Sequence, residues 1–223
     1  MNSGARVALG VTLVVFGALA GVGLHRMLRP RATLRPAAPA ALAPHPQSSP
    51  APRVIPVVVP DLALEDLSGT SHRLSDWTGH PVIINFWATW CEPCRREIPL
   101  LKSLRHERSD DGLAIVGIAV DFRAAVAAYA RHAGIDYPVL IGEEEGLAAV
   151  HAFGMDLVFP FSVFADQQGR VVAVKLGELH QDEAEFILDR VQEIDRGTLT
   201  LAGARQQIQT RLKDLAVERA KHA

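Results

Sequence analysis

Three continuous apolar runs divide the middle of the chain and predict buried β-strands. They are "PVIINFWA" at 81–88, "GLAIVGIAVD" at 112–121 and "YPVLIG" at 137–142. Each run is short, contains β-branched residues and lacks polar alternation, which is typical of parallel strands buried on both faces. Helical segments separate the runs, so the pattern predicts strands and helices in alternation.

Helical spacing predicts the remaining elements of the same region. One helix should start at the first cysteine and continue through "REIPLLKSLRHE", where the internal Pro99 predicts a kink. The segment 123–134 ends at a glycine stop, and a shorter helix follows at 146–154. Towards the end of the chain, "DEAEFILDRVQEI" is amphipathic and residues 200–220 can form a further helix.

Two hairpins complete the pattern and define the fold class. The segment 62–77 should turn at Ser68 and Gly69, and the strands 161–166 and 171–177 should pair through "QQGR". These elements predict an α/β fold, with a mixed central sheet covered by helices on both faces. A right-handed crossover places the turn at 88–91 on the carboxyl edge of the sheet, where α/β proteins carry their chemistry.

The first sixty residues follow a different pattern. Residues 7–24 contain no charged side chain, a length at the lower limit for crossing a bilayer, and "ALA" at 18–20 matches a leader cleavage site. We therefore expect residues 1–24 to be a signal-anchor or a cleaved signal peptide. Residues 25–60 read as a Pro/Ala-rich linker. The folded domain should then occupy 61–195, followed by a C-terminal helical extension at 196–223.

The charges around the apolar leader give conflicting orientations. Arg6 precedes it, whereas four arginines follow it between residues 26 and 35, which by the positive-inside rule favours a cytoplasmic domain. A charged start, an apolar stretch and an A-x-A site together form an export pattern. We expect export, with the domain either tethered to the membrane or secreted after cleavage.

Composition limits the chemistry that this domain can carry. The 223 residues have a formal net charge of −2, so no basic field favours nucleic-acid binding. The chain contains two cysteines, too few for a disulfide-stapled scaffold. A zinc site would need histidines to complete it, and the nine histidines show no partner at zinc-finger spacing.

The two cysteines lie in "WCEPC", directly after the first buried run. Cys91 should occupy the N-terminus of a helix, where free N–H groups and the helix dipole lower the pKa of a thiol. Cys94 follows one turn later, behind Cys91, and Pro93 between them fits a first helical turn. The spacing favours a nucleophilic Cys91 and a resolving Cys94.

The segment "GHPVIINFWATWCEPCRREIP" resembles the active site of membrane-tethered thiol–disulfide oxidoreductases of bacterial envelopes, the TlpA/ResA group. The similarity extends over about residues 60–195 and includes "FGMDLVFPFSVFADQQGRVVAVKLGE". It implies a thioredoxin-like fold with an N-terminal hairpin and a central βα insertion. By position, Pro160 would be the family's cis-proline facing the nucleophilic sulfur. The backbone of Phe159 would then be free to pair with a substrate strand.

Other residues near the motif add to this picture or depart from it. Asn85 stands where thioredoxins proper have a buried Asp that accepts a proton. Glu92 either opposes the Cys91 thiolate and relays protons, or is a solvated residue favoured by the helix dipole. Trp90 should be exposed beside the thiol, while Trp87 suits either the substrate face or the core. Phe159 and Phe161 make the expected substrate surface more apolar than in relatives.

The resemblance implies an enzyme that reduces disulfides of substrate proteins at the periplasmic side of a bacterial envelope. A membrane electron donor would keep it reduced, and no cofactor is expected. Candidate substrates are apocytochrome c, during cytochrome c maturation, or a protein of the oxidase copper site. Alternatives are a Cu(I)-handling metallochaperone using both thiolates, a disulfide oxidase or isomerase, and a redox-inactive interaction module.

Overall fold

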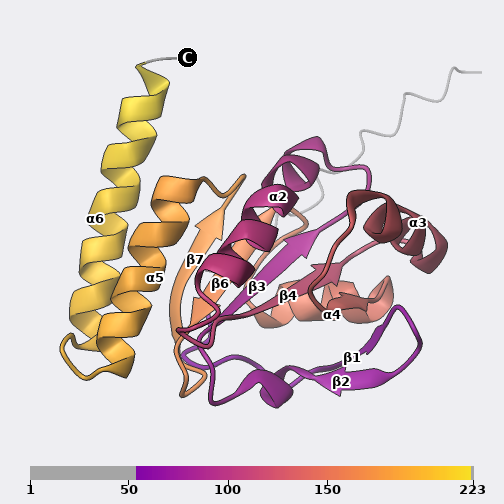
Figure 1. The fold of residues 1–223 in the computed structure, drawn as a ribbon, viewed down its shortest axis with the longest axis horizontal. Coiled ribbons are helices and arrows are strands. Elements are labelled where there is room, and N and C mark those ends of the chain that lie inside the picture. Colours follow the sequence, from indigo (N-terminus) through magenta and orange to yellow (C-terminus); the bar gives the residue numbers. More distant parts are fainter. Residues whose placement is uncertain (1–53, 222–223) are drawn as a thin grey trace, which may run out of the picture. The chain divides into compact units, whose positions relative to one another are not determined.

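The computed structural model describes residues 54–221, so the predicted leader and most of the predicted linker lie outside the described residues. A seven-stranded mixed sheet, in the order β2-β1-β5-β4-β3-β6-β7, forms the centre of the domain (Figure 1). The α/β fold with a mixed central sheet is confirmed. The strands are β1 (Ala63–Asp66), β2 (Ser71–Arg73), β3 (Val82–Trp87), β4 (Ala114–Ala119), β5 (Val139–Ile141), β6 (Phe161–Ala165) and β7 (Val171–Leu176).

The helices follow the strands almost as the spacing predicts. In chain order they are the 3-10 helix η1 (Leu74–Trp77), α2 (Glu92–Glu107), α3 (Arg123–Ala133), α4 (Glu144–Ala152), α5 (Gln181–Asp195) and α6 (Leu201–Ala220). Helix α3 ends at Gly134, whose φ of 59° is left-handed, as the glycine stop predicts. Helix α4 starts at Glu144, two residues before the predicted start, because the acidic residues there suit a helix N-terminus.

The three predicted apolar runs are adjacent parallel strands. Strand β3 pairs with β4 and β4 with β5, and every residue of β3 is buried. Strand β6 lies antiparallel on the other side of β3, with Asn85 opposite Ser162, and β7 completes the edge. The predicted hairpins β1–β2 and β6–β7 are both confirmed, and β1 joins the sheet beside β5.

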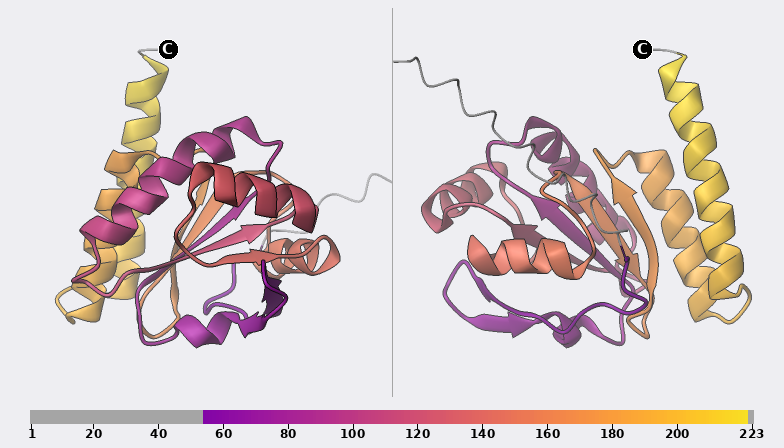
Figure 2. Two further views of the ribbon diagram at one scale, coloured as in Figure 1. Left: turned by 45° about the vertical axis from the view of Figure 1, so that its right-hand side comes forward. Right: turned by 180° about the vertical axis from the view of Figure 1, so that it is seen from behind.

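Alternating side chains divide the interior into two cores. On one face, Ile83 and Trp87 of β3 pack with α2, α3, α5 and α6, and on the other Ile84 and Phe86 pack with α4 and the β1–η1 segment. Figure 2 shows α4 on the opposite face of the sheet from α2 and α3, with α5 and α6 side by side at the β7 edge. Period-two alternation in β3 therefore supplies both cores from one strand.

The start of the described chain is fixed to this framework. The Val59 N–H donates to the carbonyl of Gly169 and the Val171 N–H donates to the carbonyl of Val57, which adds a short segment beside β7. At Gly154 the φ is +70°, and a Cβ there would lie 2.4 Å from the carbonyl oxygen of Val54. This position therefore requires glycine.

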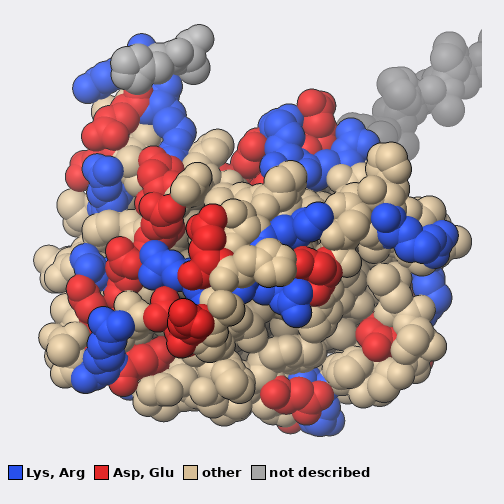
Figure 3. Space-filling model, in the orientation of Figure 1, with Lys and Arg blue, Asp and Glu red and all other residues tan. Residues whose placement is uncertain are grey.

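The outer surface carries charges of both signs. In the face shown in Figure 3, Lys and Arg alternate with Asp and Glu over α5 and α6. Helix α6 still contributes Ala204 and Ile208 to the core, so it packs on the domain. Within residues 54–221, none of the helices combines the length and the hydropathy of a membrane span.

Candidate functional site

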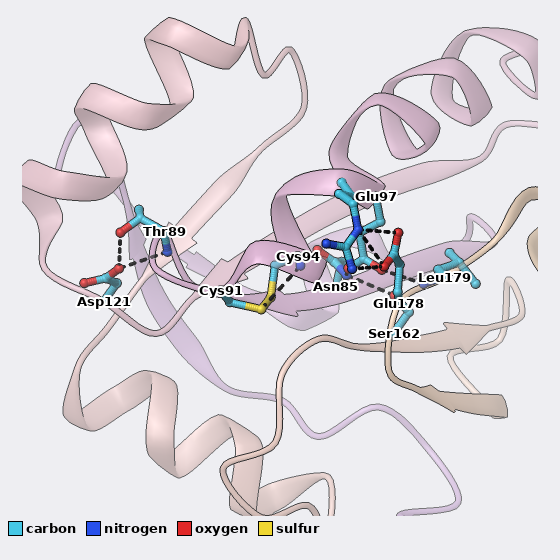
Figure 4. Close-up of a disulfide and its surroundings, with 10 residues drawn as sticks. Asn85, Thr89, Cys91, Cys94, Glu97, Asp121, Ser162, Glu178 and Leu179 are labelled. Atoms are coloured by element: carbon cyan, nitrogen blue, oxygen red, sulfur yellow. Dashed lines mark hydrogen bonds and ion pairs between the residues drawn. A yellow bond between two sulfur atoms is a disulfide. The ribbon is translucent and has the colours of Figure 1, made fainter. Parts of the chain in front are cut away.

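A disulfide joins Cys91 and Cys94 at the N-terminus of α2, just beyond the carboxyl end of β3 (Figure 4). Cys91 is the N-cap residue, and its Sγ accepts the Cys94 N–H at 3.3 Å. Cys91 is 5% exposed and Cys94 is fully buried, so a second protein can reach Cys91 alone. Pro93 lies in the first turn, where the helix leaves N–H groups without partners.

The turn before the cysteines is held by a neighbouring strand end. Asp121, two residues beyond the end of β4, accepts both the N–H and the hydroxyl of Thr89 through one carboxylate oxygen. Its other oxygen accepts the N–H of Phe122 at 2.7 Å. This carboxylate connects the carboxyl ends of β3 and β4 and thereby positions the turn that carries Cys91.

Two aromatic side chains, those of Trp90 and Phe159, lie together beside the turn that carries Cys91. Trp90 is 68% exposed, and its ring lies 6.1 Å from that of Phe159, edge to face. The peptide bond between Phe159 and Pro160 is cis, as the resemblance implies. Trp87 is fully buried, so its alternative as a core residue is correct.

The structure adds three exposed apolar residues that the sequence reading did not select. Leu157 and Val158 precede Phe159, and Phe122 follows the carboxylate that holds the turn. All three are more than half exposed. Leu157 and Val158 adjoin Phe159 in the chain, and exposed apolar side chains that lie together favour contact with another protein.

A buried carboxyl group lies on the same side of α2 as Cys94. Glu97 follows one helical turn later and is 1% exposed. Its Oε1 accepts from Asn85 Nδ2 at 2.7 Å, and its Oε2 accepts the N–H of Leu179 at the same distance. Asn85 also donates to the hydroxyl of Ser162 at 3.0 Å. Asn85 thus orients a carboxyl group in place of carrying one.

Burial decides the protonation of Glu97. Desolvation raises its pKa from 4.5 to about 7, against the lowering effect of the hydrogen bonds from Leu179 and Asn85. A carboxyl group with this pKa can accept or release a proton near neutral pH. Glu97 can therefore act as the buried proton acceptor that Asn85, in place of an Asp, does not provide.

Glu92 lies outside this buried group. Its side chain is 73% exposed and pairs with Arg96 at 3.1 Å, one turn along α2. Arg96 also contacts the carboxylate of Glu178, in the loop after β7. This exposed ion pair agrees with the interpretation of Glu92 as a solvated helix residue, and its proposed proton relay stays a prediction.

Helical spacing in the sequence also points to Glu97, although this residue lies outside the cysteine motif. The buried positions of α2 are Cys94, Glu97, Ile98, Leu101 and Leu104. They follow the helical period, so a carboxyl three residues after Cys94 is expected on the buried face. The contacts of α2 with Leu179 and Glu178 span 82 residues and have no local signal.

Comparison with known proteins agrees with this geometry. The family model described as AhpC/TSA family matches residues 56–196, more than half of the chain. The chain belongs to the AhpC/TSA family. Among its relatives is the thiol-disulfide oxidoreductase ResA of Geobacillus kaustophilus. The two sequences are 31% identical over 134 residues, and the match covers 60% of this chain and 75% of that relative. The chain is 35% identical over 136 residues to the thioredoxin-like protein YneN of Bacillus subtilis, covering 58% and 76%.

Solved structures support the fold of this AhpC/TSA family member. A secreted thiol-disulfide isomerase from Corynebacterium glutamicum superposes with a TM-score of 0.55 at 29% identity, covering 60% of this chain and 85% of that chain. A putative thiol:disulfide interchange protein DsbE from Chlorobium tepidum gives the same TM-score at 23% identity, covering 62% and 96%. The latter likeness concerns the fold alone.

Proposed function

We propose that this protein is a thiol–disulfide oxidoreductase that works through Cys91 and Cys94. The observation that supports this most directly is the asymmetry of the disulfide. Cys91 is 5% exposed and directly follows the exposed Trp90, whereas Cys94 is fully buried on the helix face that carries Glu97. A reversible dithiol needs these two different environments. One thiol must be accessible to the substrate disulfide, and the other must react only after the mixed disulfide has formed.

In the reducing direction, the Cys91 thiolate attacks one sulfur of a substrate disulfide. A mixed disulfide forms, and the second substrate sulfur leaves as a thiolate. The Cys94 thiolate then attacks the Cys91 sulfur, which regenerates the Cys91–Cys94 disulfide and releases the first substrate sulfur as a thiolate. Two electrons pass from the dithiol to the substrate, and the leaving thiolates take up the two protons that the protein thiols lost.

Glu97 accepts the proton of Cys94 in this scheme. The Cys94 thiol is fully buried and must become a thiolate before it attacks, so a nearby proton acceptor promotes the second step. Glu97 lies one turn away on the same face, with its pKa near neutral pH. A carboxyl group of ordinary pKa would be ionised at pH 7 but a weaker base.

In this proposal, the substrate segment contacts the surface formed by Trp90 and Phe159 beside Cys91. Trp90 and Phe159 supply apolar contact area, Pro93 shapes the surface next to the sulfur, and the backbone before Pro160 pairs with an extended segment. Glu92 contributes its charge at the edge of this surface. Substrates with apolar residues flanking the disulfide fit these contacts.

The direction and setting of the reaction follow from the resemblance to envelope reductases. In this proposal the domain faces the periplasm, receives electrons from a membrane donor and reduces disulfide-containing proteins. Apocytochrome c and a copper-site protein are the two candidate substrates, and residues 1–24 supply the tether or leader.

Substitution of the two cysteines tests the activity. Cys91→Ser should abolish insulin reduction, whereas Cys94→Ser should accumulate a mixed disulfide with substrate, because the resolving thiol is missing. Val217→Ala, at an exposed position of α6, is the matched control and should retain activity. Insulin reduction retained in Cys91→Ser would contradict the proposal.

The reduction potential of the Cys91–Cys94 pair tests the direction. A reductase should have a potential near or below that of thioredoxin, about −270 mV. A value towards that of a strong oxidant, about −120 mV, would indicate formation or isomerisation of disulfides.

A further inference from the structure

The loop between β7 and α5 is attached to the outer side of α2. The Arg96 Nε and Nη2 donate to the Glu178 carboxylate at 3.0 and 2.6 Å, a two-pronged contact that Arg forms and Lys cannot reproduce. Glu178 is less than a quarter exposed, although Arg96 is half exposed. The contact therefore fixes Glu178 more firmly than an ordinary surface pair does.

The residue after Glu178 is attached to the inner side of the same helix. The Leu179 N–H donates to the buried Glu97 carboxylate at 2.7 Å, and Leu179 itself is 2% exposed. Two consecutive residues of α2 thus hold two consecutive residues of the loop, one pair outside and one inside. Figure 4 shows Glu97, Glu178 and Leu179 close together beside the disulfide.

The same loop also reaches the segment that carries the cis peptide bond. The Gly177 N–H donates to the Pro160 carbonyl at 2.9 Å. Lys175 supports the loop from β7, since its Nζ donates to the carbonyl of Glu178 at 3.0 Å. A displacement of this loop would therefore alter both the hydrogen bond to Glu97 and the support of Pro160.

We propose that Arg96 is a positioning residue, which holds Glu178 so that the Leu179 N–H stays on the Glu97 carboxyl and keeps that carboxyl available to Cys94. This proposal rests on the function proposed for Glu97. Arg96 has a second effect through charge, because it neutralises Glu178. Without that neutralisation, the negative charge of Glu178 opposes ionisation of Glu97 more strongly.

Other titratable groups near Glu97 also influence its pKa, so the test must distinguish their effects from that of Arg96. Lys175 lowers the pKa of Glu97, and Glu178 raises it. Tyr137 has a raised pKa, first because of burial and then because of Glu97, so its hydroxyl remains neutral. Loss of Arg96 leaves all of these groups in place. It changes the position and the compensation of Glu178, and it also removes the exposed pair with Glu92.

The alternative is that the Arg96–Glu178 pair merely adds stability. Exposed ion pairs contribute little to stability. A pair that only added stability would leave the pH midpoint of Glu97 unchanged when it is removed. The test therefore measures where Glu97 titrates. The probe is the side-chain carboxyl 13C signal of Glu97 in the oxidised full-length chain, assigned by its loss in Glu97→Gln.

Arg96→Gln should raise the pH midpoint of the Glu97 signal by about 0.5–1 unit, because the Leu179 hydrogen bond weakens and Glu178 is no longer compensated. Arg95→Gln removes the same charge from the preceding exposed position and should leave the midpoint within about 0.2 units of the original. Arg96→Lys keeps the charge without the two-pronged geometry and should give an intermediate shift.

Three results would overturn the proposal: an unchanged midpoint in Arg96→Gln, equal shifts in Arg96→Gln and Arg95→Gln, or an unchanged midpoint in Arg96→Lys. If Arg96→Gln fails to fold, the Arg96→Lys comparison decides alone. The titration is independent of turnover. Insulin reduction retained in Cys91→Ser would refute the proposed function, and a fully active Glu97→Gln would refute the role of Glu97 in it. The midpoint shift would still report on Arg96 in either case.

Discussion

Replacement of Glu97 by glutamine removes one ionisable group from the interior and keeps the shape of the side chain. Glutamine can still accept the Leu179 N–H through its oxygen. Its amide can donate to Asn85, whose Oδ1 has no hydrogen-bond partner among residues 54–221 and can turn towards it. We therefore expect Glu97→Gln to fold, and its stability to differ from the parent protein in a way that depends on pH.

The sign follows from the raised pKa. Between pH 4.5 and about 7 the folded protein holds a proton on Glu97 that the unfolded chain has released. The free energy of unfolding therefore falls as the pH rises through this interval, and it remains lower above pH 7. The difference between the folded and unfolded pKa values corresponds to a total loss of about 3 kcal/mol in the free energy of unfolding, which is reached above pH 7.

At pH 5 most of this loss has not yet occurred, and at pH 8.5 it is complete. Between these two pH values, the parent protein should lose about 2–3 kcal/mol more of its free energy of unfolding than Glu97→Gln. Urea denaturation of both oxidised proteins at the two pH values measures this difference, and contributions of other titrating groups cancel. A stability difference that does not change with pH would refute the assignment of a raised pKa to Glu97.

Two further predictions concern neighbours of the site. Asn85→Asp would place a second carboxyl group within hydrogen-bond distance of Glu97, and the two groups cannot both ionise. The free energy of unfolding, measured by urea denaturation, should therefore fall by about 2–4 kcal/mol at pH 8 and by less at pH 5. Equal losses at both pH values would contradict this prediction. Phe86 is fully buried, stacks on Phe161 at 4.3 Å and meets Phe153 edge to face, so Phe86→Ala should cost about 3–5 kcal/mol in the same assay. A loss below about 2 kcal/mol would show that the opposite core is loosely packed.

Local patterns predicted the elements because each depends on neighbouring residues. The apolar run of β3, the N-terminal position of Cys91 and the glycine stop of α3 are all properties of short segments. The family pattern also located Pro160, whose cis peptide bond no local spacing would reveal. The predicted roles of these residues in catalysis and substrate binding remain to be tested.

The contacts that complete the site could not be predicted in this way. Asp121 meets Thr89 across 32 residues, and Leu179 meets Glu97 across 82. Such contacts arise when the sheet brings distant strand ends together, so they become visible only with the fold. Glu97 itself was predictable in principle, since helical spacing from Cys94 places it inside, but a charged residue is ordinarily expected at the surface.

The pair of Asn85 and Ser162 also has a consequence for how the chain assembles. Apart from Asn85 and Ser162, strands β3 and β6 contain only apolar residues, which do not by themselves distinguish one alignment from another. A slip of one residue would turn Ser162 into the opposite, aromatic layer, and a slip of two would set Asn85 against Phe164 or Pro160. One alignment alone gives the buried amide its hydroxyl partner, 77 residues away. The polar pair therefore favours this strand register, so the side chain that orients the buried Glu97 also favours the correct pairing of β3 with β6.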